Sequence, residues 1–382
     1  MKLLYITQMY PSEELPQYCI FLHLQVKALI AQGAQMTVVV PTTERDSGQI
    51  VYDGVPVIYL YYRNYSRSIL YPLVASQLSK ELRRFCDGSE YDAVYAIHAA
   101  ANLLDFARVT AQRAHKPLIV HYRGYNIFEE YNKEPKVLFS DPEKVREKVV
   151  KASALSIGVS RKTSEIITAR FPDARTATVY NGVDTDEFSP SDNAVSSEKI
   201  HILCVANLIP IKGHIYLFNA VKEISQKHPN LRLVTDIVGR GSYEEYLKQY
   251  VREHQIPNVL FHGYVQHDEV ARWMQSADIF TLPSVYESFG NVVLESMACR
   301  KPVLIFSGQG VDELIEDGVS GMIADKGDQA DYTAKLEALL TDEALRKRIA
   351  QAGYDIARQY TWDRSAKCII SEISAVYSVE TR

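Results

Sequence analysis

Short apolar runs alternate with longer amphipathic segments along most of the chain. A run such as Leu3 to Ile6 has the length of a buried strand, whereas Phe21 to Gln32 has the apolar spacing of a helix. Strands that alternate with helices form βαβ units around a parallel sheet, so the pattern predicts an α/β fold. The predicted strands are residues 3–6, 36–40, 93–97, 118–120, 200–205, 231–238, 259–261, 279–282 and 303–306, and a further helix is predicted over residues 215–228.

The strand and helix rhythm occurs twice, which predicts two doubly wound domains in series. A chain of 382 residues also exceeds the roughly 250 to 300 residues at which a single core stops growing. A polar, turn-rich stretch from Asn181 to Ser197 is typical of a linker. We therefore expect domains at residues 1–185 and 186–362, with the last amphipathic segment, residues 363–382, crossing back to the first domain.

Composition and charge exclude several classes of protein. The chain is 47% hydrophobic and 23% charged, as in ordinary globular proteins, and its net charge of −5 gives no general attraction for nucleic acid. The five cysteines lie too far apart for CxxC metal or redox sites, so we expect small buried side chains in a reducing compartment. No apolar stretch reaches the ~18 residues of a membrane span, and Met1 leads directly into a strand, so a cytoplasmic protein is expected.

The segment Pro283 to Glu295 carries the strongest chemical signal. It follows a predicted strand and enters a helix at Phe289-Gly290-Asn291, where free N–H groups and the helix dipole favour an anion such as a diphosphate. Glu287 would precede this helix, and Glu295, about one turn inside it, could accept hydrogen bonds from a ribose diol. The alternative is that both glutamates are solvated charges beside a helix.

Three other loops follow predicted strands in the second half. Lys212-Gly213 could present an ammonium group to a phosphate, although the Walker A order is absent and an exposed lysine near a helix start is the alternative. Gly239-Arg240-Gly241 and Gly263-Tyr264-Val265 could form tight turns near a nucleotide, with Arg240 adding positive charge. No GxGxxG follows the first strand, which argues against a nicotinamide-dependent dehydrogenase.

Together, these loops resemble the family-four retaining glycosyltransferases of GT-B fold over nearly the whole chain. The resemblance rests on Asn207 to Gly213, Gly239 to Gly241, Phe261 to Val265, the Glu-x(7)-Glu pair Glu287 and Glu295, Lys301-Pro302-Val303, Gly310 to Ile315, and Tyr180 to Asp184 with Phe188. It implies two Rossmann-like domains facing a central cleft, a nucleoside diphosphate sugar donor, retention of anomeric configuration, no metal or other cofactor, and an acceptor on the N-terminal domain.

The same resemblance assigns residues. Lys212 would stabilise the leaving diphosphate, Glu295 would bind the ribose and Glu287 would contact the transferred sugar. Catalytic candidates are therefore Glu287, Lys212, Arg123 and His98, and the donor-binding set is Asn207, Lys212, Gly239, Arg240, Tyr264, Val265, Glu287, Phe289, Gly290, Asn291 and Glu295. No metal ligands are expected.

The chain departs from the family pattern at three positions. Asn207 stands where many relatives carry arginine, and Arg240 or Arg123 would have to supply the missing charge. Arg123 stands in the usual place of a histidine near the donor sugar, with His98 as a second candidate beside the cleft and His121 directed into the strands. A purely structural role remains the alternative for both histidines. Cys19 stands where glycine is common.

The function predicted from these observations is transfer of a sugar, with retention, to a glycan, lipid-linked saccharide or other hydroxyl acceptor in cell-surface polysaccharide assembly. A UDP-sugar is favoured over a GDP-sugar. The alternatives are a nucleotide-sugar epimerase or phosphorylase, and a non-catalytic nucleotide-sugar-binding partner protein. Basic and aromatic residues between Tyr59 and Phe85 could bind an anionic acceptor or a lipid head group at the inner membrane face, or could simply form a solvated helix face.

Overall fold

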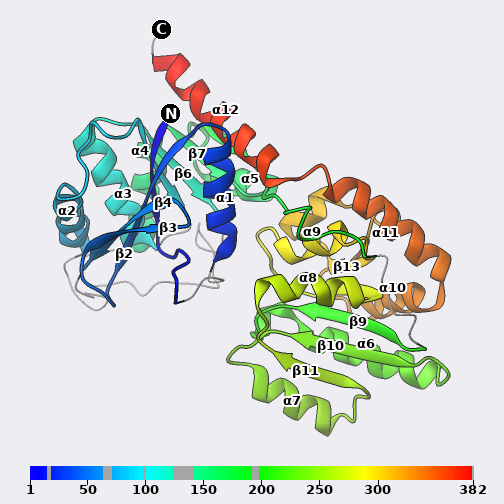
Figure 1. Ribbon diagram of the computed structural model, residues 1–382. Coiled ribbons are helices and arrows are strands. Elements are labelled where there is room, and N and C mark those ends of the chain that lie inside the picture. The colour runs from blue at the N-terminus through cyan, green and yellow to red at the C-terminus, as the bar shows by residue number, and fades with distance from the viewer. Residues whose placement is uncertain (15–18, 63–70, 98–99, 124–140, 192–197, 381–382) are drawn as a thin grey trace. The chain divides into compact units, whose positions relative to one another are not determined.

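The structure is a computed structural model, which describes residues 1–14, 19–62, 71–97, 100–123, 141–191 and 198–380 of the 382-residue chain. The chain divides into two compact units. Unit 1 comprises Met1–Tyr180 and Trp362–Arg382, and unit 2 comprises Asn181–Thr361. Each unit contains its own sheet flanked by helices, as Figure 1 shows, and each is described separately below.

Unit 1 is a doubly wound α/β unit. Its described strands are β1 (Lys2–Thr7), β2 (Gln35–Thr42), β3 (Gly48–Tyr52), β4 (Val55–Tyr61), β5 (Ala93–Ile97), β6 (Leu118–Tyr122), β7 (Leu155–Gly158) and β8 (Thr176–Thr178). Its helices are α1 (Ile20–Ala31), α2 (Tyr71–Leu82), α3 (Ala101–Ala114), α4 (Pro142–Ala152), α5 (Arg161–Arg170) and α12 (Trp362–Glu380). The sheet order is β3-β4-β2-β1-β5-β6-β7-β8, and all its pairings are parallel except β3 with β4.

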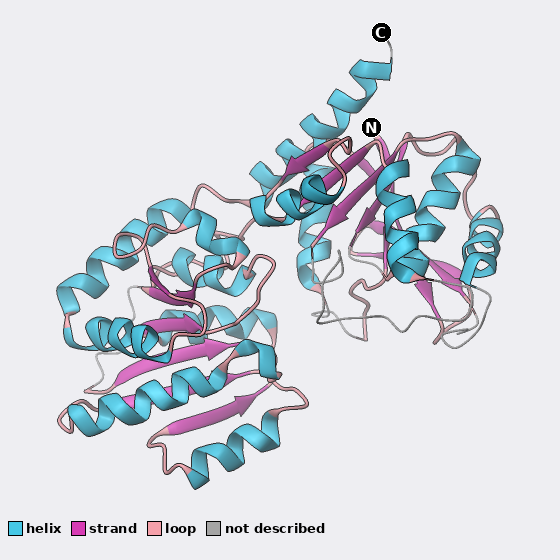
Figure 2. Ribbon diagram, turned by 180° about the vertical axis from the view of Figure 1, so that it is seen from behind, coloured by secondary structure: helices cyan, strands magenta, loops and turns pink. Residues whose placement is uncertain are grey.

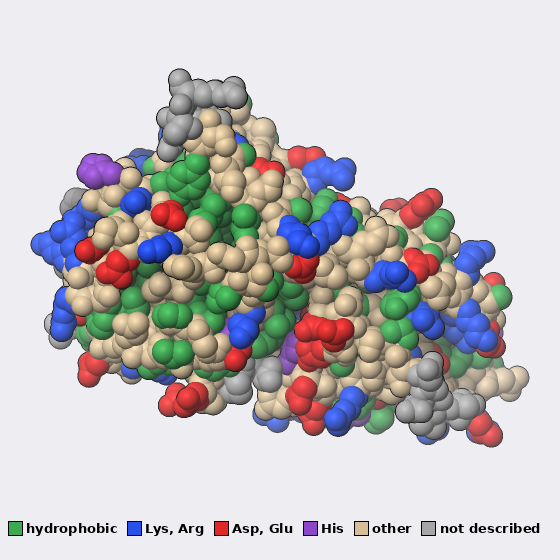
Figure 3. All heavy atoms as spheres, turned by 45° about the horizontal axis from the view of Figure 1, so that its top comes forward, with side chains coloured by type: hydrophobic (Ala, Val, Ile, Leu, Met, Phe, Trp, Pro, Cys, Tyr) green, Lys and Arg blue, Asp and Glu red, His purple; other side chains and the backbone are tan. Residues whose placement is uncertain are grey.

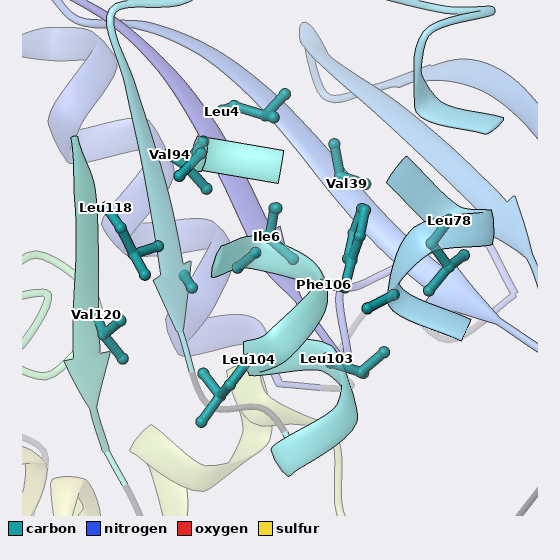
Figure 4. Close-up of a cluster of buried hydrophobic side chains, with 14 of the residues drawn as sticks. Leu4, Ile6, Val39, Leu78, Val94, Leu103, Leu104, Phe106, Leu118 and Val120 are labelled. Atoms are coloured by element: carbon teal, nitrogen blue, oxygen red, sulfur yellow. The ribbon is translucent and has the colours of Figure 1, made fainter. Parts of the chain in front are cut away.

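Alternate residues of the unit 1 strands enter two different cores. On one face, Leu4 and Ile6 of β1 pack with Phe106 of α3 and Leu78 of α2, as Figure 4 shows. On the other face, Leu3 and Tyr5 pack with residues of α1 and α12. Because successive side chains of a strand point to opposite faces, an apolar strand of this kind needs helices on both sides.

The last helix, α12, is part of unit 1. Its buried residues Ala366, Ile369, Ile373 and Val376 recur at helical spacing and lie in the same core as Leu22, Val26 and Leu29 of α1. Tyr377 also donates a hydrogen bond from its hydroxyl to the carbonyl of Asp92 at 2.9 Å. The chain therefore returns to unit 1 after it has completed unit 2.

Unit 2 is an all-parallel sheet with the order β11-β10-β9-β12-β13-β14. Its strands are β9 (Ile200–Val205), β10 (Leu233–Val238), β11 (Val259–Gly263), β12 (Ile279–Leu282), β13 (Val303–Phe306) and β14 (Met322–Ala324). Its helices are the short η2 (Pro210–Lys212) and η3 (Gly310–Leu314), together with α6 (His214–Lys227), α7 (Glu244–Glu253), α8 (His267–Ser276), α9 (Asn291–Ala298), α10 (Gln329–Thr341) and α11 (Glu343–Ala357). Figure 2 shows these helices around the sheet.

The strand order of unit 2 reverses direction between β9 and β12. The chain runs outward from β9 through β10 to β11, and then returns to start β12 on the other side of β9. In open α/β sheets, ligands bind beside the carboxyl ends of the strands at such a switch point. The loops that follow β9 and β12 are therefore where a ligand of unit 2 is expected.

The predicted doubly wound α/β architecture is confirmed in both units. The predicted strands 93–97, 200–205, 279–282 and 303–306 match β5, β9, β12 and β13 to the residue. Among the described residues, no helix is both long and apolar enough to cross a bilayer. Basic and acidic side chains are interspersed on the face shown in Figure 3, in keeping with the small net charge.

Candidate active site at the switch point of unit 2

The loops after β9 and β12 are joined by close backbone contact. The amide of Val285 donates a hydrogen bond to the carbonyl of Ile211 at 2.9 Å. Gly213 has a φ of 68°, and a Cβ added there would lie 1.9 Å from the carbonyl oxygen of Pro283. Only glycine fits this position, because a side chain would meet both an unfavourable backbone conformation and a fixed carbonyl. The glycine therefore lets the loop of Lys212 touch the loop of Glu287.

Lys212 and Glu287 form an ion pair between these two loops. Lys212 Nζ donates a hydrogen bond to Glu287 Oε2, and each side chain is only 13% exposed. The amide of Gly310 donates to the carbonyl of Glu287 at 3.1 Å and fixes the loop that carries it. The two charges are thus neither solvated nor separate, and the alternative of exposed helix-flank charges does not hold for this pair. Their direct contact was not predicted from the sequence.

The helix that follows Glu287 begins where the sequence predicts. Gly290, with a φ of 94°, is the N-cap of α9, and Asn291 is its first residue. Gly290 has no side chain with which to cap the helix, so the first N–H groups of α9 form a potential anion site. Phe289 is buried and therefore contributes packing beneath the loop.

A residue of the predicted linker supports the start of α9. Asn181 Nδ2 donates a hydrogen bond to Asn291 Oδ1 at 2.7 Å, and Asn181 is buried. The composition of the stretch from Asn181 predicts only a linker, so the sequence does not predict this contact. An amide-to-amide hydrogen bond between residues 110 positions apart has no periodic signal in the sequence.

Glu295 lies in α9 beside an acid and histidine pair. His267, the first residue of α8, is 2.9 Å from Glu187 Oε1 through its Nδ1, and it interacts electrostatically with Glu295. Burial raises the pKa of Glu295 to about 7, the His267 charge opposes this rise, and the Glu187 charge adds to it. Burial lowers the pKa of His267, but Glu187 and Glu295 outweigh it and the net pKa is raised. Neither His267 nor Glu187 was predicted as a site residue.

The outer loops of the predicted donor site also meet through their backbones. Gly239 has a φ of 135°, and a Cβ there would lie 1.9 Å from the carbonyl oxygen of Ala206. Arg240 is exposed, and its guanidinium group lies over Gly263, where a Cβ would be 3.3 Å from Arg240 Nε. Tyr264 is 57% exposed. These loops place Arg240 and Tyr264 at the surface beside the end of β11.

Two further donor-site predictions lie on the same loops. Asn207 is the second residue after β9 and is exposed. Its carbonyl accepts a hydrogen bond from the amide of Ile209 at 2.9 Å. Val265 is half-buried just before α8. The structure thus brings the predicted donor-binding residues to the carboxyl ends of β9, β10, β11 and β12, all within unit 2.

The predicted residues of unit 1 are described within that unit alone. Arg123 follows β6 and is only 7% exposed; its guanidinium carbon lies 5.7 Å from the ring centroids of both Phe21 and Trp362. Burial lowers its pKa. His121 is directed into the sheet, as expected, with Nδ1 2.6 Å from the hydroxyl of Tyr95. His98 lies outside the described residues, and the roles of Arg123 and His98 stay predictions.

In the part of the chain that the structure describes, no group of three or more His, Cys, Asp or Glu side chains is placed to hold a metal ion.

Fold and site together define the class of protein as a GT-B fold with a candidate nucleotide-diphosphate site at the switch point of unit 2. Two family models match in succession, "Glycosyltransferase Family 4" over residues 20–187 and "Glycosyl transferases group 1" over residues 185–356. The chain belongs to glycosyltransferase family 4, as its motifs predicted.

Similar curated proteins match about half of this chain. A D-inositol 3-phosphate glycosyltransferase of Nocardioides sp. is 30% identical over 51% of this chain and 47% of its own length. An uncharacterized glycosyltransferase of Methanocaldococcus jannaschii is 32% identical over 55% of this chain and 57% of its own length. The chain thus matches about half the length of these curated relatives.

Solved structures match the chain over nearly its full length. The sucrose-phosphate synthase of Thermosynechococcus elongatus has a TM-score of 0.82 at 16% identity and covers 99% of both chains. HepE of Anabaena, solved in complex with UDP and glucose, has a TM-score of 0.75 at 21% identity and covers 98% of this chain and 100% of its own. At these identities the likeness establishes the GT-B fold.

Proposed function

We propose that the protein transfers a sugar from a UDP-sugar to a hydroxyl acceptor, with retention of anomeric configuration and without a metal ion. The observation that carries the proposal is the Lys212–Glu287 pair, which lies beside the N-terminus of α9 at the switch point of unit 2. This arrangement combines a cation, the positive end of a helix and a carboxylate in one partly buried place. Such a site suits a diphosphate joined to a sugar.

Lys212 and the first N–H groups of α9 would stabilise the charge that grows on the departing diphosphate. The bond from the sugar's anomeric carbon to the diphosphate oxygen breaks, and a bond from that carbon to the acceptor oxygen forms on the same face. The acceptor's proton passes to the departing phosphate oxygen, so no separate general base is required. Glu287 would orient the transferred sugar, whose hydroxyl groups can donate to its carboxylate.

Glu295 would bind the ribose, and the loop of Tyr264 and Val265 would lie beside the base. A carboxylate that accepts two hydrogen bonds is a common partner of a ribose diol. The choice of uridine is supported by the similarity to HepE, which was solved with UDP and with UDP-glucose. Arg240, exposed over Gly263, would supply the positive charge that Asn207 lacks.

The acceptor we propose is a glycan, a lipid-linked saccharide or another hydroxyl compound used in cell-surface polysaccharide assembly, bound by unit 1. The protein would act in the cytoplasm or at the inner face of the membrane. The relatives named D-inositol 3-phosphate glycosyltransferase support only the general part of this proposal, transfer to a hydroxyl-bearing acceptor.

A thermal-shift panel tests the donor site. UDP-, GDP- and ADP-sugars are added in the presence of EDTA to the wild type and to Glu295→Ala, because a ligand that binds only the native state raises its melting temperature. We expect stabilisation by UDP-sugars, weakened in the variant. Stabilisation by a different nucleotide would overturn the choice of uridine, and no shift with any donor would favour a non-catalytic partner protein.

A further inference from the structure

We propose that His267, held by Glu187, is a positioning residue that favours the carboxylate form of Glu295 for the donor's ribose. The inference deepens the proposed function and rests on it for the identity of the ligand. The hydrogen bond between His267 and Glu187 is present in the structure, and the coupling of His267 to Glu295 can be measured without any ligand.

The segment from Asn181 to Phe188 forms an ordered turn that presents Glu187. Asp184 Oδ1 accepts hydrogen bonds from the amides of Asp186 at 3.0 Å and Glu187 at 3.2 Å. The amide of Phe188 donates to the carbonyl of Asp184 at 2.9 Å, and the Phe188 side chain is buried. A chain closed on itself in this way fixes the direction of the carboxylate that it carries.

Glu187 and Phe188 together hold the imidazole of His267. Glu187 Oε1 is 2.9 Å from His267 Nδ1, and the Phe188 ring meets the imidazole edge-on, with centroids 5.3 Å apart and an interplanar angle of 84°. His267 is 19% exposed and Glu187 is 28% exposed. A partly buried hydrogen bond to a carboxylate favours the protonated imidazole, whose other nitrogen, Nε2, is then also a donor.

His267 and Glu295 lie on helices that pack against each other. His267 begins α8, Glu295 lies within α9, and the two side chains interact electrostatically. A carboxyl group taken out of water prefers its neutral form, whereas a ribose diol donates its hydrogen bonds best to a carboxylate. The imidazolium supplies the positive charge that favours the carboxylate in this partly buried place.

The other titratable groups around these side chains do not replace His267. Asp268, next in sequence, adds negative charge and further favours the imidazolium. Cys299, one turn after Glu295, is buried, and burial first of all raises its pKa to about 12, so it is neutral near pH 7. Lys301 interacts with Cys299 rather than directly with Glu295. Among these groups, only His267 lowers the pKa of Glu295.

A ligand-free measurement tests the coupling first. Protein containing ¹³C-labelled histidine is titrated by NMR, and the spectrum of His267→Gln assigns the His267 resonance. We expect His267 to titrate above its ordinary pKa of about 6.5 and to titrate lower in both Glu295→Gln and Glu187→Gln. An unchanged His267 titration in Glu295→Gln would show that the two groups do not interact and would overturn the inference, whether or not any nucleotide binds.

The affinity for UDP, measured by calorimetry from pH 6 to pH 9, tests the consequence. His267→Gln should weaken binding about tenfold below pH 7, because a smaller fraction of Glu295 is then ionised, and should approach the wild type at pH 9, where His267 of the wild type is neutral and Glu295 is ionised in both proteins. The control is His228→Gln, which removes a similar histidine–glutamate pair, His228 Nε2 to Glu337 Oε1 at 2.6 Å, elsewhere in unit 2.

The outcomes separate the inference from the proposed function. A loss of affinity that is equal at every pH would indicate that the Glu187–His267 pair only anchors the turn, and would reject the positioning role. If UDP fails to bind the wild type, the proposed donor fails, while the NMR titration still decides whether His267 and Glu295 are coupled. If His267→Gln does not fold, the His267 shift in Glu295→Gln decides the inference, with the resonance assigned by exclusion from the other histidine variants.

Discussion

Lys212 and Glu287 neutralise each other across the switch point of unit 2, with both side chains 13% exposed. A bound diphosphate would compete with Glu287 for the ammonium group, and a bound sugar would compete with Lys212 for the carboxylate. The pair therefore keeps both groups in place before a donor arrives, since each charge satisfies the other while water is largely excluded.

Replacing Lys212 by alanine should reduce turnover roughly 10- to 100-fold, because a hydrogen bond to a charged group contributes about 1.5 to 3 kcal/mol. Initial rates with a saturating UDP-sugar measure this loss. Lys227→Ala is the control, since it removes the exposed pair of Lys227 with Glu337, 2.8 Å apart, on another part of unit 2. Equal rates for Lys212→Ala and Lys227→Ala would remove Lys212 from the mechanism.

Replacing Glu287 by glutamine should separate binding from transfer. The amide keeps the size of the side chain but no longer competes for the Lys212 charge, so UDP should bind as tightly as in the wild type or more tightly. Transfer should fall, because the carboxylate that we propose orients the sugar is lost. Calorimetry with UDP and rate measurements on the same preparation check this; equally weakened UDP binding and transfer would assign Glu287 to the diphosphate instead.

Replacing Gly213 by alanine should destabilise the protein more than replacing Gly318. Both glycines have positive φ angles, 68° and 72°, but a Cβ at 213 would lie 1.9 Å from the Pro283 carbonyl, whereas nothing lies within 4 Å at 318. The loss of unfolding free energy in Gly318→Ala is thus the cost of the backbone conformation alone, about 1 kcal/mol. The additional loss in Gly213→Ala is the cost of the clash with the Pro283 carbonyl. Urea denaturation provides both values; similar losses would mean that the two loops can move apart.

The sequence predicts several central strands well, but it misses β4 and β7 inside the unit 1 sheet and the edge strands β3, β8 and β14. Strands β5, β9, β12 and β13 are short, nearly continuous apolar runs, as expected for strands covered by helices on both faces. By contrast, β3 has no buried residue and is formed through the hairpin turn at Asp53-Gly54, while β8 and β14 have three residues each. A strand without a buried face, such as β3, or of only three residues, such as β8 and β14, leaves no hydrophobic period to detect.

The candidate site likewise contains residues that the sequence pattern predicts and residues that it does not. The loops of Lys212 and Glu287 could be predicted because each follows an apolar strand and precedes a helix, where ligands bind in open α/β sheets, and Glu295 lies in the helix that follows the second loop. The Glu187–His267 pair could not, because the two residues are 80 positions apart and Glu187 lies in a polar stretch with the composition of a linker. The detectable signal is local: an aspartate three residues before Glu187, whose side chain can accept from the following amides and close a turn.

The raised pKa of Glu295 also predicts how stability depends on pH. Burial raises the pKa of this carboxyl group to about 7 in the folded protein, against about 4.3 in an unfolded chain. The folded state therefore binds the proton more tightly, so the contribution of Glu295 to stability is fully present below about pH 4.3 and is lost as the pH rises through about 7. Above pH 7 the site holds a partly desolvated carboxylate that costs stability.

Glu295→Gln should accordingly raise the melting temperature of the ligand-free protein at pH 8 and change it less at pH 5, where the wild-type carboxyl group is already neutral. The same variant should bind UDP more weakly, because the amide cannot accept two charge-assisted hydrogen bonds from the ribose. Calorimetric melting at the two pH values, with and without UDP, measures both effects.

The matched control is Glu337→Gln. In the wild type, hydrogen bonds to Lys227 and His228 lower the pKa of the Glu337 carboxylate. Its stabilising contribution is present above about pH 4.3 and lost as the pH falls through the folded pKa, so this variant should lower the melting temperature at pH 8, the opposite sign to Glu295→Gln. If both variants melt at a lower temperature than the wild type at pH 8, the surroundings of Glu295 stabilise its carboxylate. The ionised Glu295 then does not lower the stability of the folded protein, and the prediction is wrong.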